Sequence, residues 1–246
     1  MVWCFRGSKG GSGCSVVAAA AAVLNARRGP VLLVDAAGGD LSRILGVEPR
    51  GPGLTRWLRH PNPPPDSLAR LEVPATDGVS LLPYRGPGPG GGGDITPDSP
   101  GSPGSPESPG SPCSSGDGVD AEERWRLLAE LLAADERLVV VDLGLASPVS
   151  GSAFRAIGGV AGRSTLVTRL CYLALARAME QPVPDDVIVV AEPDRALRLS
   201  DVEAALRVPV ATIRWDPAVA RAVDSGLLTR RLPRALHRLP PAGALR

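Results

Sequence analysis

The feature that most constrains the fold of this chain is a glycine-rich segment near its start. The segment consists of Ser8, Lys9, Gly10, Gly11, Ser12, Gly13, Cys14 and Ser15. An apolar run at 2–5 precedes it, an alanine- and valine-rich run at 16–26 follows, and a second apolar run occupies 31–34. This order is typical of a βαβ unit with a glycine-rich turn. Because such a turn points backbone N–H groups into one concavity at the positive end of a helix dipole, we expect it to bind phosphate.

The segment matches only part of the phosphate-binding pattern G-x-x-x-x-G-K-[ST]. Gly13 and Ser15 occupy their expected positions, whereas Ser8 stands where the first glycine is usual. Cys14 stands where the pattern has its phosphate-binding lysine. The sequence therefore predicts a backbone cradle that lacks its usual side-chain cation.

Lys9 is the only lysine in the chain, which has 27 lysine and arginine residues together. Lysine is a compact point charge, whereas arginine presents a broad planar fork. A tight glycine-rich turn around phosphate favours the compact cation, so we interpret Lys9 as a phosphate ligand. The alternative is that Lys9 is an ordinary surface residue.

Lys9, Gly10, Gly11 and Gly13 together resemble the deviant Walker A loop of the ParA/MinD family of P-loop ATPases. The degenerate loop resembles in particular the TadZ/CpaE-like branch, which includes septum-site-determining and pilus-localising proteins. The resemblance implies that residues 8–15 bind ATP with Mg²⁺ and that a homodimer forms on nucleotide. In that dimer Lys9 would reach the phosphates held by the partner copy and act in catalysis.

A second segment resembles the next motif of the same family. Asp35 takes the first position of that motif, and Asp40 with Leu41 takes its closing pair. Ala37 stands where active members carry a second aspartate that positions water. The resemblance implies a catalytic role for Asp35, which would manage metal and water, and switch-like positions at Asp35 and Asp40. Because the loop lysine and this second carboxylate are both absent, we expect ATP hydrolysis to be slow or lost.

A third segment resembles the Walker B strand. The apolar run at 138–141 ends at Asp142, and Gly144 follows where the family has a glycine after the strand. An aspartate at the carboxyl end of a strand beside a phosphate loop can hold Mg²⁺ through water. We therefore expect Ser15 and Asp142 to form the Mg²⁺ site, with Gly144 as a further switch-like position.

Apolar runs and helix-forming segments alternate along the rest of the chain. This rhythm predicts an α/β fold, a doubly wound and mostly parallel sheet in a single domain. Further expected strands cover 79–83, 138–142, 164–168, 187–191 and 209–213. Expected helices cover 14–28, 53–59, 66–71 and 171–179, and others begin after N-caps at Asp120, Ser200 and Asp216. The segment 216–226 also resembles the C-terminal part of ParA/MinD-type domains.

Composition changes sharply in the middle of the chain. Residues 86–118 are rich in glycine, serine and proline and have almost no apolar side chains, so we predict a disordered insertion. The P-loop NTPase-like domain then covers 1–85 and 119–232, and 233–246 form a basic tail. From Leu227 onward there are several arginines and no acid. We expect a solvated terminus, with membrane contact or a basic face for DNA or a protein partner as alternatives.

Charge and cysteine content indicate the cellular location of the protein. The net charge of +1 gives no overall attraction to nucleic acid or anionic lipid. The four cysteines have neither metal-site nor disulfide spacing, and no apolar run is long enough to span a bilayer. We predict a cytoplasmic protein with free thiols. The alternative is a peripheral position at the inner face of the membrane. Cys14 is interpreted as a small residue that fits its place; the alternative is an oxidisable thiol with a lowered pKa at a helix N-terminus.

The predicted function is that of an ATP-binding spatial organiser with weak nucleotide binding and slow or absent hydrolysis. The resemblance implies partners in septum placement, chromosome or plasmid partitioning, or localisation of a pilus or secretion machine. One alternative is a partner-binding scaffold on the same fold that binds no nucleotide. A lower alternative is a Rossmann dinucleotide-binding protein, although Val16 would occupy its third glycine position.

Overall fold

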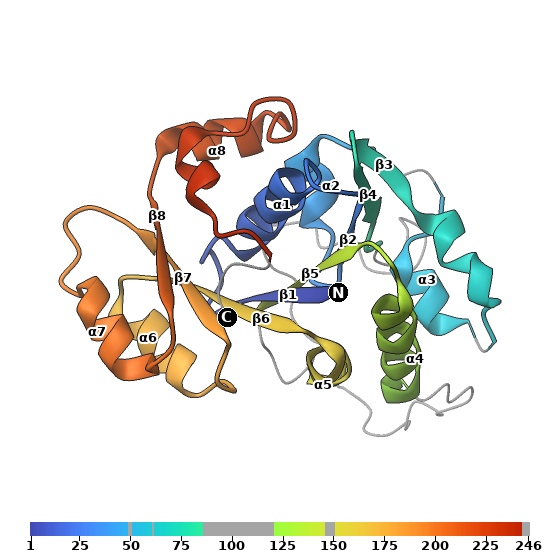
Figure 1. Cartoon of the computed structure of the whole chain (residues 1–246), viewed down its shortest axis with the longest axis horizontal. Helices are drawn as coiled ribbons and strands as arrows, with labels where there is room; N and C mark the ends of the chain where they lie inside the picture. Colours follow the sequence, from blue (N-terminus) through green and yellow to red (C-terminus); the bar gives the residue numbers. More distant parts are fainter. Residues whose placement is uncertain (49–50, 61, 86–120, 146–150, 243–246) are drawn as a thin grey trace, which may run out of the picture.

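The computed structural model describes residues 1–48, 51–60, 62–85, 121–145 and 151–242. The predicted insertion at 86–118, the predicted N-cap at Asp120 and the last four residues lie outside these ranges. The described residues form one open sheet with helices on both faces (Figure 1). The predicted fold class, a doubly wound α/β domain, is confirmed.

Eight strands in the described residues form one sheet in the order β3-β4-β2-β5-β1-β6-β7-β8. All neighbouring pairs are parallel except β3 with β4. The strands are β1 Val2–Gly7, β2 Val31–Asp35, β3 Val73–Thr76, β4 Val79–Leu82, β5 Leu138–Leu145, β6 Arg163–Arg169, β7 Asp186–Ala191 and β8 Val210–Arg214. Because β5 lies between β1 and β2, which are neighbours in the Rossmann order, the Rossmann alternative is wrong.

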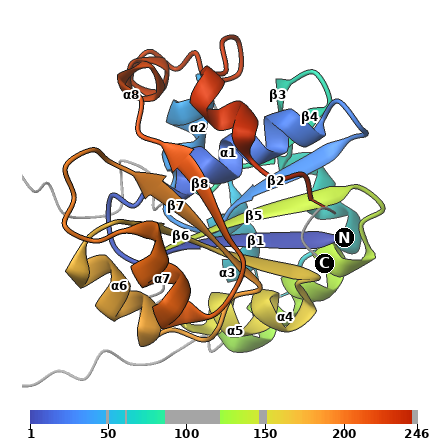
Figure 2. The ribbon, with the colours of Figure 1, turned by 60° about the vertical axis from the view of Figure 1, so that its left-hand side comes forward.

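Helices cover the two faces unequally (Figures 1 and 2). One face carries α1, α2 and α8, and the other carries α3, α4, α5, α6 and α7. The α-helices are α1 Cys14–Asn25, α2 Asp40–Leu45, α3 Leu54–Arg59, α4 Ala121–Ala134, α5 Gly151–Val160, α6 Tyr172–Met179, α7 Leu199–Leu206 and α8 Pro217–Asp224. Short 3-10 helices are η1 Pro65–Ser67, η2 Ala69–Leu71 and η4 Arg234–Arg238.

Successive side chains of the central strand β1 point to opposite faces of the sheet, and both faces are covered by helices. Trp3 and Phe5 pack on the α1 side, and Val2 and Cys4 pack on the side of α4 and α5. Residues 18–22 of α1 are all alanine and almost fully buried, so the helix lies close to the sheet. This packing fixes the loop between β1 and α1 at the carboxyl end of the central strands.

Several predicted boundaries are wrong. The first helix ends at Asn25 rather than at 28, and 66–71 form two 3-10 helices in place of one helix. Ser200 is not an N-cap: α7 begins at Leu199, and the Asp201 carboxylate accepts from the N–H of Arg198 at 2.7 Å. A carboxylate of the first turn therefore closes this helix start, one residue after the predicted N-cap.

The predicted start of α8 is confirmed. Asp216 is the N-cap, its carboxylate accepts from the N–H of Ala218 at 2.8 Å, and Pro217 is the first helical residue. Proline suits that position because its missing N–H has no intrahelical partner there.

The segment after α8 packs on the domain, so the expectation of a solvated terminus is wrong for 227–242. Leu228, Leu236 and Leu239 are buried in the core on the α1 side. The Arg163 guanidinium donates to the carbonyl of Pro241 at 3.0 Å. This segment therefore completes the core beside α1 and β8.

No helix of the described residues is both long enough and apolar enough to cross a membrane.

Candidate functional site

The loop at 8–13 lies between the carboxyl end of β1 and the first turn of α1. Gly11 and Gly13 have φ of +72° and +92°, a left-handed backbone that other residues rarely adopt. Gly13 caps α1, whose first N–H groups have no partner within the helix. A cavity of about 300 Å³ opens here, lined by Lys9 to Ser15 of the loop and helix, with Asp40 and Gly144. The loop thus has the geometry of an anion cradle.

Two buried serines of the loop have different roles. Ser8 shares a hydrogen bond of 2.9 Å with the Thr168 hydroxyl of β6, and both side chains are buried. Ser12 is buried, and a Cβ at Gly7 would come within 2.5 Å of its hydroxyl oxygen. Ser8, predicted as a nucleotide ligand, therefore ties the loop to the sheet, while Ser12 lines the cavity.

Cys14 is buried, with 7% of its surface exposed, and its thiol donates to Oδ1 of Asp142 at 3.3 Å. Burial raises the pKa of Cys14 well above its ordinary range, and the charge of Asp142 raises it further. The alternative of an easily ionised thiol is wrong, because burial and the nearby carboxylate both disfavour the thiolate. Cys14 therefore acts as a small neutral donor to Asp142.

Asp142 sits at the carboxyl side of β5 with 1% of its surface exposed. Burial raises its pKa to about 6, against the opposing effects of the Ser15 hydroxyl and the Gly144 N–H. Its Oδ1 accepts from Gly144 N–H at 3.0 Å, whereas Oδ2 is buried without a partner in the described structure. An unpartnered carboxylate oxygen beside the Ser15 hydroxyl fits a hydrated Mg²⁺. The structure brings together Ser15 and Asp142, the two residues expected to form the Mg²⁺ site.

Asp35 pairs in register with Asp142 on the neighbouring strand and is fully buried. Oδ1 accepts from the N–H groups of Ala37, Gly38 and Gly39 at 3.1–3.2 Å, and Oδ2 accepts from Leu41 at 3.3 Å. Burial raises the pKa of Asp35, and these four N–H groups lower it. Both oxygens thus hold the turn that leads into α2, a role the sequence interpretation missed.

The remaining predicted positions lie around the cavity mouth. Lys9 is half-buried at the rim and forms no ion pair within the described part of the chain. Asp40 is exposed at the start of α2. Gly144 has φ of +60°, and a Cβ there would lie 2.7 Å from Cβ of Ala37. Gly144 therefore lets the loop after β5 pass directly against the loop after β2.

A second cavity of about 250 Å³ lies beside the first and shares Ser12, Gly13 and Val16 with it. Its other walls are mostly apolar and come from β7, β8 and α8, with Val190, Ile213, Trp215, Val219 and Val223. The sequence interpretation did not identify this apolar cavity. The visible signal was a tryptophan directly before the capped helix at 216–224.

Comparisons with known proteins find solved structures with a similar fold. No protein-family model matches the sequence, and no curated protein matches it. Solved structures that match include MinD of Pyrococcus horikoshii with Mg-ADP, at TM-score 0.69 and 16% identity over 97% of this chain and 93% of that one. A ParA family ATPase of Chlorobium tepidum has TM-score 0.65 and 18% identity over 96% and 93%. A MinC:MinD complex of Aquifex aeolicus has TM-score 0.65 and 19% identity over 92% and 86%. The chain therefore has the ParA/MinD fold over nearly its whole length.

Proposed function

We propose that this protein binds ATP with Mg²⁺ at the loop of residues 8–15 and hydrolyses it very slowly or not at all. The observation that carries the proposal is the pairing of an intact glycine cradle with a buried neutral thiol, Cys14, bonded to Asp142. The cradle retains backbone N–H groups for phosphate, while the position that would supply a cation supplies none.

The residues divide the nucleotide between two cavities. The N–H of Ser12 donates to the Lys9 carbonyl, and the other backbone N–H groups of 10–15 would face the phosphates. Ser15 and Asp142 would hold Mg²⁺, and the adjoining apolar cavity beside Trp215 would take the base. Bound Mg²⁺ would neutralise phosphate charge. Loss of one lysine–phosphate bond weakens binding by about 1.5–3 kcal/mol, or roughly one to two decades. Loss of the same contact in the transition state slows hydrolysis on the order of a hundredfold or more.

Lys9 supplies the remaining cation, on the cavity rim. Because it is half-buried there and unpaired with any described acid, it is placed to reach a phosphate, in its own copy or in a facing one. A homodimer closed over two nucleotides follows from the second arrangement. Because Cys14 replaces the loop lysine, we propose that the protein belongs to the TadZ/CpaE-like branch and acts as a nucleotide-dependent positioning protein.

The partners we propose belong to a septum-placement, partitioning, or pilus or secretion assembly. The MinD of Aquifex aeolicus is solved as a complex with a protein partner, MinC, which gives a precedent on this fold. The location we propose is the cytoplasm, with peripheral contact at the inner face of the membrane as the alternative.

The test is binding of a fluorescent ATP analogue with Mg²⁺, measured by anisotropy on the wild type and Lys9→Ala. We expect weak binding by the wild type and a further loss of about tenfold in Lys9→Ala, from one charge-assisted contact. Arg27→Ala removes an exposed cation at the far end of α1 and serves as the matched control. Absence of binding to the wild type would favour the nucleotide-free scaffold, and rapid ATP turnover would contradict the hydrolysis proposal.

A further inference from the structure

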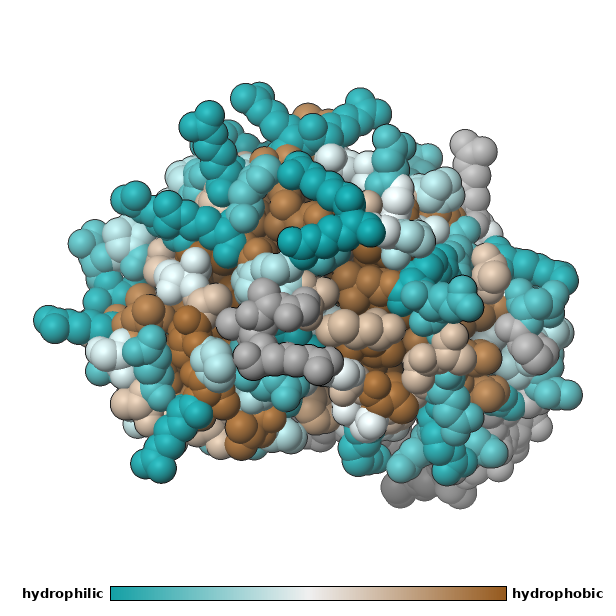
Figure 3. Space-filling view, in the orientation of Figure 1, coloured by the Kyte–Doolittle hydropathy of each residue, from teal (hydrophilic) through white to brown (hydrophobic). Residues whose placement is uncertain are grey.

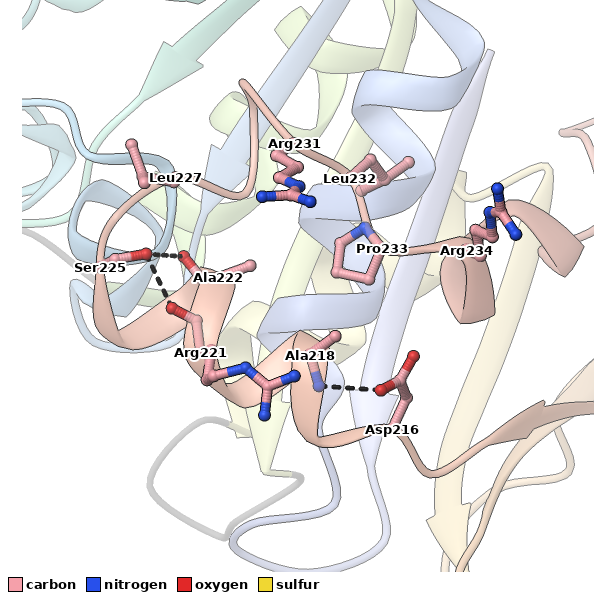
Figure 4. A pocket seen from close by; sticks show the side chains of 10 residues that line it. All are labelled: Asp216, Ala218, Arg221, Ala222, Ser225, Leu227, Arg231, Leu232, Pro233 and Arg234. Atoms are coloured by element: carbon pink, nitrogen blue, oxygen red, sulfur yellow. Dashed lines mark hydrogen bonds between the residues drawn. The ribbon is translucent and has the colours of Figure 1, made fainter.

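A cavity of about 730 Å³ lies between α8 and the segment that follows it (Figure 4). It shares no lining residue with the cavity at the phosphate loop. Three arginines from three different segments surround it: Arg221 of α8, Arg231 of the turn after α8, and Arg234 at the start of η4. We call it the arginine cavity.

Both walls of the arginine cavity are held by local bonds and packing. Asp216 caps the N-terminus of α8, and the Ser225 hydroxyl donates to the Arg221 carbonyl at 2.7 Å near the C-terminus (Figure 4). On the opposite wall, buried Leu228 and Leu236 anchor the chain to the core. The arginines therefore project from an ordered frame.

The charge of the arginine cavity is not neutralised from within the described structure. Arg221, Arg231 and Arg234 are exposed and form no ion pair among the described residues. The one acid in the lining, Asp216, already uses Oδ1 to cap α8. Guanidinium groups bind phosphate oxygens in paired hydrogen bonds, so this lining suits a phosphate-bearing ligand.

Size and apolar lining specify the ligand further. The volume lies within the range of pockets that hold small organic ligands. Leu227, Leu232 and Pro233 form apolar wall between the arginines. We propose that the arginine cavity binds a small organic anion that carries two or more phosphate groups. The three guanidinium groups come from three separate segments, so a ligand with two or more phosphate groups can engage them together.

The helix α8 separates the arginine cavity from the apolar cavity beside the phosphate loop. Ala218, Arg221 and Ala222 line the former, whereas Val219 and Val223 line the latter. This spacing presents the two faces of one helix to the two cavities. A ligand in the arginine cavity thus contacts the back of the helix that lines the apolar cavity.

The experiment is a calorimetric titration of the full chain with inorganic tripolyphosphate, without Mg²⁺ and at low salt. We expect one binding event that Arg231→Gln and Arg221→Gln each weaken about tenfold. Arg230→Gln, next in sequence, exposed and outside the cavity lining, is the matched control and should leave it unchanged. Thermal melting of each variant checks folding, which substitutions at these exposed side chains should preserve.

The outcomes separate the arginine cavity from other sources of binding. A binding event that Lys9→Ala weakens and that the arginine variants leave unchanged belongs to the phosphate loop and overturns the proposal. Binding to vesicles containing phosphatidylinositol bisphosphate that is lost in Arg231→Gln supports the same phosphate chemistry, supplied by a lipid headgroup. Binding of duplex DNA without any binding of tripolyphosphate overturns the proposal in favour of an extended basic surface.

Discussion

At the scale of single residues, the site is organised by the contact between Cys14 and Asp142. A neutral thiol cannot offset the burial of a carboxylate, and Asp35 lies on the adjacent strand in the same register. Burial is the main cause that raises the pKa of Asp142 to about 6. Cys14, which we propose weakens nucleotide binding, therefore also leaves a carboxylate that is costly to ionise.

A pH-dependent stability follows. Asp142 has a pKa of about 6 in the folded protein and near 3.8 in the unfolded chain, so the folded protein binds this proton more tightly. The contribution of Asp142 to the free energy of unfolding therefore falls as the pH rises from about 4 to 6, and it stays low above pH 6. Asp142→Asn removes the charge and keeps an acceptor for Cys14. We expect it to raise the free energy of unfolding by about 2 kcal/mol at pH 8 and by little at pH 4. Urea unfolding at both pH values measures this, with exposed Asp40→Asn as control; a loss of stability at pH 8 would contradict it.

Gly144 provides a second residue-scale prediction. Gly144→Ala would force a side chain into a left-handed backbone and against Ala37, at a cost of about 1–3 kcal/mol. Gly158→Ala is the matched control, since Gly158 lies exposed inside α5 with open space around it. There alanine should stabilise by up to about 1 kcal/mol. Thermal melts that gave both variants equal stability would refute the close approach of the two loops.

At the scale of elements, β6, β7 and the C-terminal segment are joined by one buried ion pair. Arg163 Nε donates to Asp186 at 2.6 Å, both side chains are almost fully buried, and the guanidinium lies 4.2 Å from the Trp3 ring centroid. The Thr165 hydroxyl donates to the other Asp186 oxygen at 2.9 Å. The pair therefore fixes these elements around β1.

Removal of one partner should be costly. Asp186→Ala leaves the Arg163 charge buried without its acid, and we expect a loss of about 3–5 kcal/mol in the free energy of unfolding. Asp66→Ala breaks a pair with Arg70 whose side chains are both largely exposed, and should cost less than about 1 kcal/mol. Chemical denaturation distinguishes the two. A similar small loss for both would show that the buried pair is not engaged in solution.

The elements best predicted from sequence were those with the strongest local signals. The apolar runs of β1, β2 and β5 and the capped start at Asp216 were placed correctly. The sequence did not reveal β3, which contains Pro74 and is stabilised as an edge strand by pairing with β4. It also missed α5, whose two adjacent glycines lower helix propensity and which packs against α4.

At the scale of the whole molecule, strand order creates the site. With β5 between β1 and β2, the ends of three buried strands bring the phosphate loop, Asp35 and Asp142 to one edge. Motif spacing predicted this gathering. It gave no sign of the apolar cavity, because that cavity is built from β7, β8 and α8, which are far from the loop in sequence. The packing of 227–242 was missed for another reason: its leucines are sparse and lie among arginines.

The surface of the molecule gives less information on interfaces than the site does. Figure 3 shows polar side chains interspersed with apolar areas on one face of the molecule, so no single uniform patch there marks an interface. The candidate site is instead recognised by its geometry at the carboxyl edge of the sheet. This makes nucleotide affinity, rather than surface character, the decisive property.

The most direct test is the affinity for an ATP analogue with Mg²⁺ of Cys14→Lys compared with the wild type. Cys171→Lys, at a partly exposed free cysteine, is the matched control. A lysine at 14 would supply the missing cation beside Asp142, so we predict binding ten- to a hundredfold tighter than wild type, with the control unchanged. Equal affinities of Cys14→Lys and the wild type, with the fold of both intact, would contradict the claim that this cysteine weakens a working phosphate site.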